Sequence, residues 1–197
     1  MTEQVRVRAA ADLSTRDRQI LAAAGSAFHE RGFHGIGMDE LGRRAGLSGP
    51  SLYRHFSGKD EILATLLNAA MDELATATQP PFDDPDGDLR RAIDHHARFA
   101  LEEAQLVSLY QREVRNLVDP WASAFAKRMG AYTRTWEQLL ASRRPDDSAE
   151  RVAATTQACL GLIFSVSGWP ARARRVGDAD RVVELVQQLI ERGLAAD

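Results

Sequence analysis

The chain of 197 residues contains a single cysteine, Cys159, which excludes an internal disulfide bond. Such low cysteine use is typical of a reducing compartment. The sequence also lacks an apolar run near the roughly 18 residues of a membrane span, and no signal peptide opens it. We therefore expect a cytoplasmic protein that has no membrane partner. Because Cys159 lies in an apolar run, we expect its thiol to be buried and inert.

A strong excess of charge of either sign is absent as well. The formal net charge is −3 at pH 7, which argues against a polybasic protein that coats nucleic acid or membranes. The charge is unevenly spread, because residues 1–59 contain nine basic and six acidic side chains while the remainder is acidic. This asymmetry is compatible with DNA binding by the N-terminal part of the chain.

The residues of a catalytic or metal centre are missing too. No pairing of a nucleophile with a base can be recognised. His29 and His34 lie five residues apart with the helix-ending Gly32 between them, whereas the zinc-protease motif needs two histidines four apart on one helix. His95 and His96 are adjacent, so they point to different faces of a helix. We expect no enzyme activity, no metal and no cofactor.

The most informative stretch is residues 37–56, GMDELGRRAGLSGPSLYRHF. Its first half has apolar residues at helical spacing from Met38 to Ala45. Gly46 can take the left-handed conformation that closes a helix, Ser48 can cap a second helix, and Pro50 suits the first turn of that helix. Two short helices around a tight turn are the helix-turn-helix layout, whose second helix enters the DNA major groove.

The second helix, expected over residues 48–56, offers little apolar surface. Leu52 and Phe56 can face inward, while the other side chains are small or form hydrogen bonds. Small residues at its start allow close approach to phosphates, and the helix dipole favours anions there. The alternative from spacing alone is a solvated surface turn.

The same stretch resembles the signature of the TetR family of transcriptional repressors. The matching residues are Gly46, Ser48, Leu52, Tyr53, His55, Phe56, Lys59 and Leu63, preceded by Ile20, Ala23, Ala24, Phe28, Gly32 and Phe33. The match covers about the first third of the chain. Two departures are Ile36-Gly37, where the family commonly has Thr or Ser, and Gly42, where Ala is usual.

The resemblance implies a DNA-binding site in this part of the chain. We expect Tyr53, His55 and Lys59 to contact phosphates, and Ser51 and Arg54 to contact bases, since Arg can pair with two acceptors on guanine. The alternative for Lys59 is a solvated ammonium paired with Asp60 or Glu61. The candidate DNA-binding residues are Arg43, Arg44, Ser48, Gly49, Pro50, Ser51, Tyr53, Arg54, His55 and Lys59.

The whole chain is predicted to be all-α, with about nine helices. We expect a flexible arm over residues 1–13 and a DNA-binding domain over 14–74, which opens on a capping box at Ser14–Asp17. A second capping box is predicted at Ser57–Asp60. The cluster QPPFDDPDGD (79–88) then breaks the helical pattern. A larger helical domain for ligand binding and dimerisation is expected over 79–197.

The last two helices are apolar on more than one face, so something must cover them. Dimerisation is the economical solution, because a palindromic DNA site needs two recognition helices. The family resemblance implies the same, a four-helix bundle formed by the last two helices of each copy. The candidate interface residues are Leu160, Ile163, Val183, Val186, Leu189 and Ile190.

Aromatic residues at helical spacing in the middle helices are compatible either with plain core or with an effector pocket. The resemblance favours a pocket. The candidate ligand-binding residues are Phe99, Tyr110, Arg112, Trp121, Phe125, Tyr132, Trp136 and Phe164. The stretch Tyr110–Glu113 also resembles repressors of fatty-acid or acyl-thioester catabolism.

The function hypothesis is therefore a dimeric transcriptional repressor with double-stranded operator DNA and a small-molecule effector as partners. A largely apolar effector, such as a fatty acid or acyl thioester, would release it from a palindromic operator. The alternative is a helical small-molecule-binding or scaffold protein without DNA binding. Activation of transcription in place of repression stays open.

Overall fold

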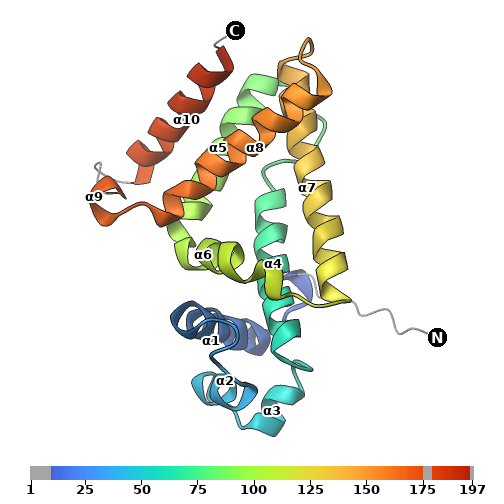
Figure 1. The fold of residues 1–197 in the computed structure, drawn as a ribbon, viewed down its shortest axis with the longest axis vertical. Helices are drawn as coiled ribbons and strands as arrows, with labels where there is room; N and C mark the ends of the chain where they lie inside the picture. The colour runs from blue at the N-terminus through green and yellow to red at the C-terminus, as the bar shows by residue number, and fades with distance from the viewer. Residues whose placement is uncertain (1–9, 175–178, 196–197) are drawn as a thin grey trace, which may run out of the picture. The chain divides into compact units, whose positions relative to one another are not determined.

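The structure, a computed structural model, describes residues 10–174 and 179–195 of the chain. Within these ranges it contains ten α-helices, three short 3-10 helices and no strand (Figure 1). The predicted all-α class is confirmed. The expected arm, residues 1–13, lies largely outside the described ranges, although Ala10–Asp12 forms a 3-10 helix, η1. The backbone N–H of Ala10 donates to Asp72 Oδ2 at 2.7 Å.

The chain divides into two compact units. Of the described residues, unit 1 comprises those up to Glu73 together with Ser108–Met129, and unit 2 comprises Leu74–Val107 and those from Gly130 onwards. The domain limits expected from the sequence, 14–74 and 79–197, remain a prediction. The segment 108–129 lies within the expected second domain, 79–197, but packs in unit 1.

Helix α1, Thr15–Arg31, begins at the predicted capping box. The Ser14 hydroxyl accepts from the backbone N–H of Asp17, and the Asp17 carboxylate accepts in return from the backbone N–H of Ser14. These bonds satisfy N–H groups that have no partner inside the helix. Gly32 ends the helix with a φ of 73°, which residues with a Cβ rarely adopt.

Helices α2, Met38–Arg44, and α3, Gly49–Tyr53, form the predicted helix-turn-helix. Gly46 takes the expected left-handed conformation, with a φ of 66°, and Ser48 caps α3. The absence of a side chain at Gly42 has a reason. A Cβ there would lie 3.2 Å from the Leu47 carbonyl oxygen, so glycine lets α2 approach the turn closely.

Three further helices contribute to unit 1. They are most of α4, Lys59–Ala75, the second half of α6, Ala104–Glu113, and the start of α7, Trp121–Arg143, with the 3-10 helix η2, Val114–Asn116, between the last two. At the start of α4, Ser57 bonds through both its N–H and its hydroxyl to Glu61, each at 2.7 Å, so the prediction that Asp60 completes a capping box was wrong. Glu61 lies one residue further along and reaches back across the first turn.

The core of unit 1 is made of the apolar faces that the sequence pattern indicated. Its fully buried large side chains include Ile20, Phe28, Leu41, Leu52, Phe56, Ile62 and Leu63. They come from α1, α2, the α3 segment and α4. This shared core is what holds the very short α3, since a helix of five residues is not stable alone.

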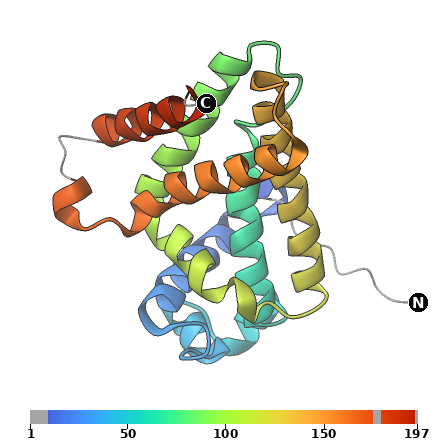
Figure 2. The same ribbon diagram turned by 45° about the horizontal axis from the view of Figure 1, so that its top comes forward.

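Unit 2 is built around α5, Pro85–Glu102. It packs against α8, Ala149–Ser165, and α10, Ala179–Ala195, as both views of the ribbon show (Figures 1 and 2). Between α8 and α10 lie the 3-10 helix η3, Val166–Gly168, and a four-residue helix that the sequence did not predict, α9, Ala171–Arg174.

The composition leads us to expect no membrane span and a buried Cys159. None of the described helices has a stretch of eighteen residues apolar enough to cross a bilayer. Cys159 is buried, and burial raises the pKa of its thiol to about 11. The reactive thiolate is therefore scarce at neutral pH.

The turn at Gly46 generates a stability prediction. A Cβ at Gly46 would meet no atom within 4 Å, so Gly46→Ala tests backbone strain alone. We expect it to lower the free energy of unfolding by about 1–2 kcal/mol, because an L-residue is strained in the left-handed region. Urea denaturation measures the change. Gly25→Ala, in the interior of α1, is the control, since its Cβ would make only an ordinary contact, 3.8 Å from Leu66 of α4, and should stabilise by up to about 1 kcal/mol. Equal changes in the free energy of unfolding of the two variants would contradict a left-handed backbone at Gly46.

Candidate functional site

The residues of the expected DNA-binding site fall into two groups: some are exposed on α3, and others form bonds inside unit 1. Leu52 and Phe56 are fully buried, as the pattern predicted, and they anchor the segment. Tyr53 is 54% exposed although it is a large aromatic residue, and Pro50 and Arg54 are exposed too. An exposed tyrosine beside an exposed arginine on a short, well-anchored helix is an available surface for a partner.

Three side chains on this surface form a chain of hydrogen bonds. The Ser48 hydroxyl donates to Ser51 Oγ at 2.9 Å, and Arg54 Nη2 donates to the same oxygen at 2.8 Å. Ser48 also caps the helix. The guanidinium of Arg54 is therefore held along the exposed face of α3, with other N–H donors left to meet a partner, since the group carries five.

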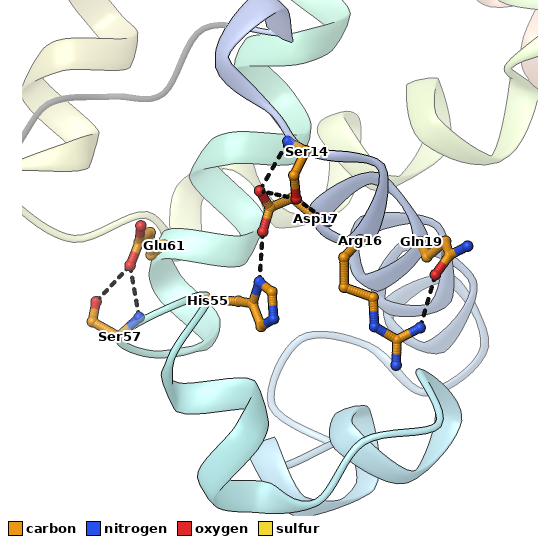
Figure 3. A network of polar contacts seen from close by, with 7 residues as sticks. All are labelled: Ser14, Arg16, Asp17, Gln19, His55, Ser57 and Glu61. Carbon is orange, nitrogen blue, oxygen red and sulfur yellow. Dashed lines mark hydrogen bonds and ion pairs between the residues drawn. The ribbon is translucent and has the colours of Figure 1, made fainter.

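His55 points in the opposite direction, toward the beginning of α1. Its Nδ1–H donates to Asp17 Oδ1 at 2.9 Å, and the Asp17 side chain is almost completely buried (Figure 3). The same carboxylate accepts from the N–H and the hydroxyl of Ser14 through its other oxygen. His55 thus connects the end of residues 48–56, called the recognition segment below, to the capping box of α1. This role was not predicted, because it depends on a contact 38 positions away in sequence.

Lys59 has a similar internal contact. Its ammonium donates to the Phe33 carbonyl oxygen at 3.0 Å and lies 4.5 Å from the centre of the Phe33 ring. The sequence left a phosphate and the carboxylates of Asp60 or Glu61 as alternative partners of Lys59, and the Phe33 carbonyl is a third. The contact ties the start of α4 to the turn after α1.

The arginines at the end of α2 differ from each other. Arg44 forms ion pairs with Glu30 at 2.7 Å and with Glu40 at 3.1 Å, and its side chain is mostly buried. Arg43 contacts Glu40 but is 74% exposed, which leaves it accessible to a phosphate. A further arginine, Arg16, was missed by the sequence analysis. It donates to the carbonyl oxygens of Ala45 and Gly46 at 3.0 and 3.2 Å and so supports the turn before α3.

The expected ligand-binding residues are distributed over both units. Tyr110, Arg112, Trp121 and Phe125 belong to unit 1, where the Tyr110 and Phe125 rings lie 6.0 Å apart. Arg112 is exposed and donates to the His29 carbonyl oxygen at 3.3 Å, so it joins α6 to the end of α1 and does not point into an apolar interior. Phe99, Tyr132, Trp136 and Phe164 belong to unit 2.

The aromatic residues of unit 2 surround a histidine. The ring of His96, on α5, lies 5.0 Å from Trp136, 5.8 Å from Tyr132 and 6.2 Å from Phe164, centre to centre. The sequence analysis considered His96 only as a metal ligand. Its spacing nevertheless placed it on the apolar face of α5, which comprises Leu89, Ala92, Ile93, His96, Ala97 and Ala100. Among the described residues, no group of three or more metal-binding side chains is arranged to hold an ion.

His96 is fully buried and its chemistry is defined by one contact. Nδ1 lies 2.6 Å from the Ala92 carbonyl oxygen, which can only accept, so Nδ1 carries a proton. Burial lowers the pKa of His96 to about 3, partly opposed by the bond to Ala92 and assisted by the nearby His95. The ring is therefore neutral near pH 7. Within the described ranges, His96 Nε2, Trp136 Nε1 and Thr156 Oγ1 are buried without a hydrogen-bond partner.

The residues expected in the dimer interface lie in unit 2. Five of them are buried inside the chain itself, namely Leu160, Ile163, Val183, Val186 and Ile190, whereas Leu189 is 48% exposed. Leu185, which was not in the expected set, is exposed on the same helix. Beside Leu189 a groove of about 270 Å³ runs between α8 and α10, with Cys159 and Leu162 in its wall. The exposed apolar surface of α10 is therefore narrower than its sequence suggested.

Comparison with known families gives two matches that together cover most of the chain. The family model described as "Bacterial regulatory proteins, tetR family" matches residues 20–66, which include α2 and α3. The model described as "Tetracyclin repressor-like, C-terminal domain" matches residues 83–171.

Curated relatives are helix-turn-helix transcriptional regulators. The activator FasR of Mycolicibacterium smegmatis is 44% identical over 64 residues, which cover 32% of this chain and only 29% of FasR. The repressor KstR2 of Mycobacterium tuberculosis is 28% identical over 144 residues, which cover 68% of each chain. Thus the relative with the higher identity matches over a short segment, and the match to KstR2 extends well beyond it.

Solved structures share the fold over nearly the whole chain. KstR2 of M. tuberculosis superposes with a TM-score of 0.76 and 22% identity, covering 94% of this chain and 98% of that one. AibR, solved in complex with isovaleryl coenzyme A and operator DNA, superposes with a TM-score of 0.75 and 19% identity, covering 88% and 97%. At these identities the likeness establishes the fold.

The bond between His55 and Asp17 generates a prediction that separates structural from DNA-contacting residues. We expect His55→Ala to lower the free energy of unfolding by about 1–3 kcal/mol, because a buried carboxylate loses a donor. Tyr53→Ala, at an exposed ring, should change it by less than about 0.5 kcal/mol. Urea denaturation of both variants provides the measurement. A His55→Ala variant as stable as the wild type would show that the bond contributes nothing.

The buried His96 generates a prediction about pH. Its pKa is about 3 in the folded chain against an ordinary 6.5, so the unfolded state alone takes up a proton as the pH falls below 6.5. The free energy of unfolding should therefore fall by about 1.4 kcal/mol per pH unit between pH 6.5 and about pH 3. Above pH 6.5 this histidine should not affect it. Urea denaturation at pH 7 and pH 5 should therefore show a loss about 2 kcal/mol larger in the wild type than in His96→Phe. Equal losses would contradict a buried neutral imidazole.

Proposed function

Because this chain belongs to the TetR family of transcriptional regulators, we propose that it is a dimeric repressor released from a palindromic operator by a small, largely apolar effector. The observation that carries the proposal is the exposed face of α3, on which Tyr53 and the bonded Ser48–Ser51–Arg54 chain are presented by a buried anchor. Repression is supported by KstR2, a repressor whose match extends over two thirds of both chains.

In the proposed complex, the exposed side chains contact DNA, and the side chains bonded inside unit 1 hold the exposed ones in place. Helix α3 enters the major groove, where Arg54 pairs with a guanine through guanidinium donors that Ser51 does not use. Tyr53 and the exposed Arg43 contact phosphates, together with backbone N–H groups at the start of α3. His55 and Lys59 act from inside, by fixing the ends of the recognition segment. Gly49 has no side chain and Pro50 has only a compact ring, which permits close approach to the groove.

Dimerisation is proposed through the surface of α8 and α10 that the described residues leave uncovered. Leu185 and Leu189 are large apolar residues exposed on α10, and the groove between α8 and α10 lies next to them. On α8, Ala158 and Gly161 are exposed and small, so another helix can approach closely. Two copies related by a two-fold axis would bury this surface in both chains and present two α3 helices to the two halves of a palindrome.

The effector site is proposed within unit 2, around His96. Its aromatic wall is suited to an apolar molecule, and its buried polar atoms provide a few hydrogen bonds. The AibR structure was solved with isovaleryl coenzyme A, which supports acyl compounds as the class to test first. Binding would favour a conformer whose two α3 helices no longer fit successive major grooves, a shift of populations and not a blocked site.

The proposed DNA contacts generate a prediction with two variants. Tyr53→Ala should weaken binding to operator and unrelated DNA alike, and reduce the slope of log affinity against log salt by about one, because one phosphate contact is lost. Arg54→Ala should reduce operator affinity by about 1–3 kcal/mol and leave binding to unrelated DNA nearly unchanged. Fluorescence anisotropy over a range of salt concentrations measures both. Loss of operator binding alone in Tyr53→Ala would contradict a phosphate role.

The proposed dimer surface generates a second prediction. Leu189→Glu places a charge in the apolar interface, so we expect a monomer with much weaker operator binding. Light scattering after gel filtration measures the mass. Val118→Glu is the matched control, because it adds the same charge at an equally exposed residue outside unit 2 and should leave the dimer intact. A dimer in both variants would show that another surface is used.

A further inference from the structure

Two buried nitrogens in unit 2 are not used by the fold. His96 Nε2 and Trp136 Nε1 both lie in the interior, and neither has a hydrogen-bond partner among the described residues. Both rings are fully buried. Proteins satisfy nearly all of their buried polar atoms, because leaving one without a partner is costly. Two such atoms on rings whose centres are 5.0 Å apart indicate a place where something else binds.

The direction of each missing hydrogen bond can be derived. His96 Nδ1 donates to the Ala92 carbonyl oxygen at 2.6 Å, and the ring is neutral, since burial holds its pKa at about 3. Nε2 therefore carries a lone pair and needs a donor. The indole nitrogen of Trp136 carries a proton and can only donate, so it needs an acceptor.

The rings closest to His96 are aromatic, and the ring of His95 also lies 5.6 Å away. Tyr132 stacks on His96 at 5.8 Å, and Phe164 lies 6.2 Å from it. The rings of His96 and Trp136 meet edge to face, at 88°, with centres 5.0 Å apart, and we take Nε2 and Nε1 to face the same small space. A wall of this kind excludes a strongly hydrated group, because little in it replaces the lost water.

Few chemical groups can satisfy both nitrogens at once. A hydroxyl donates one hydrogen bond and accepts others, so it fits His96 Nε2 and Trp136 Nε1 together. The carbonyl of a ketone or ester accepts from Trp136 but leaves His96 Nε2 unsatisfied. A carboxylate is worse, because it sets a negative charge against the lone pair of a histidine that does not become protonated.

We propose that the effector is a neutral, largely apolar molecule with a hydroxyl group that donates to His96 Nε2 and accepts from Trp136 Nε1. The inference rests on the proposed function, since it takes unit 2 to hold the effector. It replaces acyl compounds, as the class to test first, with neutral hydroxylated compounds, and it assigns the polar end of the molecule to α5 and α7.

The test compares three probes of equal chain length on the intact dimer, namely decanol, decanone and decanoate. Calorimetric titration should give decanol about tenfold tighter binding than decanone, which corresponds to about 1.4 kcal/mol for satisfying the acceptor His96 Nε2, and decanoate should bind most weakly. In His96→Phe, which keeps a ring but lacks the acceptor, the advantage of decanol over decanone should fall to about twofold or less. In Trp136→Phe, both should weaken, because both use the indole N–H.

A matched control removes another buried polar atom without changing either ring. Thr156→Val deletes the hydroxyl of a buried threonine eight residues before Phe164 on α8, about 12 Å along the helix axis. The advantage of decanol should survive this change. Its loss in Thr156→Val would overturn the assignment to His96, as would equal binding of all three probes to the wild type.

A crystal structure with decanol separates a ligand site from a site for buried water. The proposal expects the alcohol oxygen between the two nitrogens. A water molecule in that place, with the alcohol elsewhere or absent, overturns it. The outcome is independent of DNA binding, because a chain that selects an operator but ignores decanol retains the proposed function and loses only this inference.

Discussion

The recognition segment depends on one buried carboxylate. Asp17 accepts from the N–H and hydroxyl of Ser14 at the start of α1 and from His55 just after α3, so a single side chain both caps one helix and fixes the end of another (Figure 3). Helix α3 has five residues and is held by the buried Leu52 and Phe56, and the bond from His55 to Asp17 adds to this support. The orientation of everything that α3 presents to solvent therefore follows from the position of α1.

Residues that resemble a DNA-binding signature need not all touch DNA. Tyr53 and Arg54 face outward, while His55 and Lys59 form bonds inside unit 1, to Asp17 and to the carbonyl of Phe33. The division has a physical basis, because a surface that reads bases must be held rigidly to discriminate between them. Under the proposed function, a histidine and a lysine that fix the two sides of this segment would contribute to affinity through positioning.

Most of the features that local chemistry decides could be predicted, although the capping partner of Ser57 proved to be Glu61 and not Asp60. Gly46 was expected in a left-handed conformation and Ser14 in a capping box, because each depends on neighbours within a few residues. The environments of His96 and Arg112 could not be predicted in the same way, since they depend on helices far apart in sequence. The dimer residues illustrate the same limit. Hydrophobicity indicated that α10 is covered, but only the packing against α5 distinguishes buried Val186 from exposed Leu189.

The most direct test of the account is a selection of bound duplexes from a random pool by the full-length chain at low salt. If two copies each present α3 to the major groove, the selected sequences should share an inverted repeat whose half-site centres lie about 34–36 Å apart, one helical turn. Guanine should recur at one position of each half-site, opposite Arg54. A pool that shows no enrichment, or a single unrepeated site, would contradict the claim that a symmetric pair of recognition helices is what this chain is built to present.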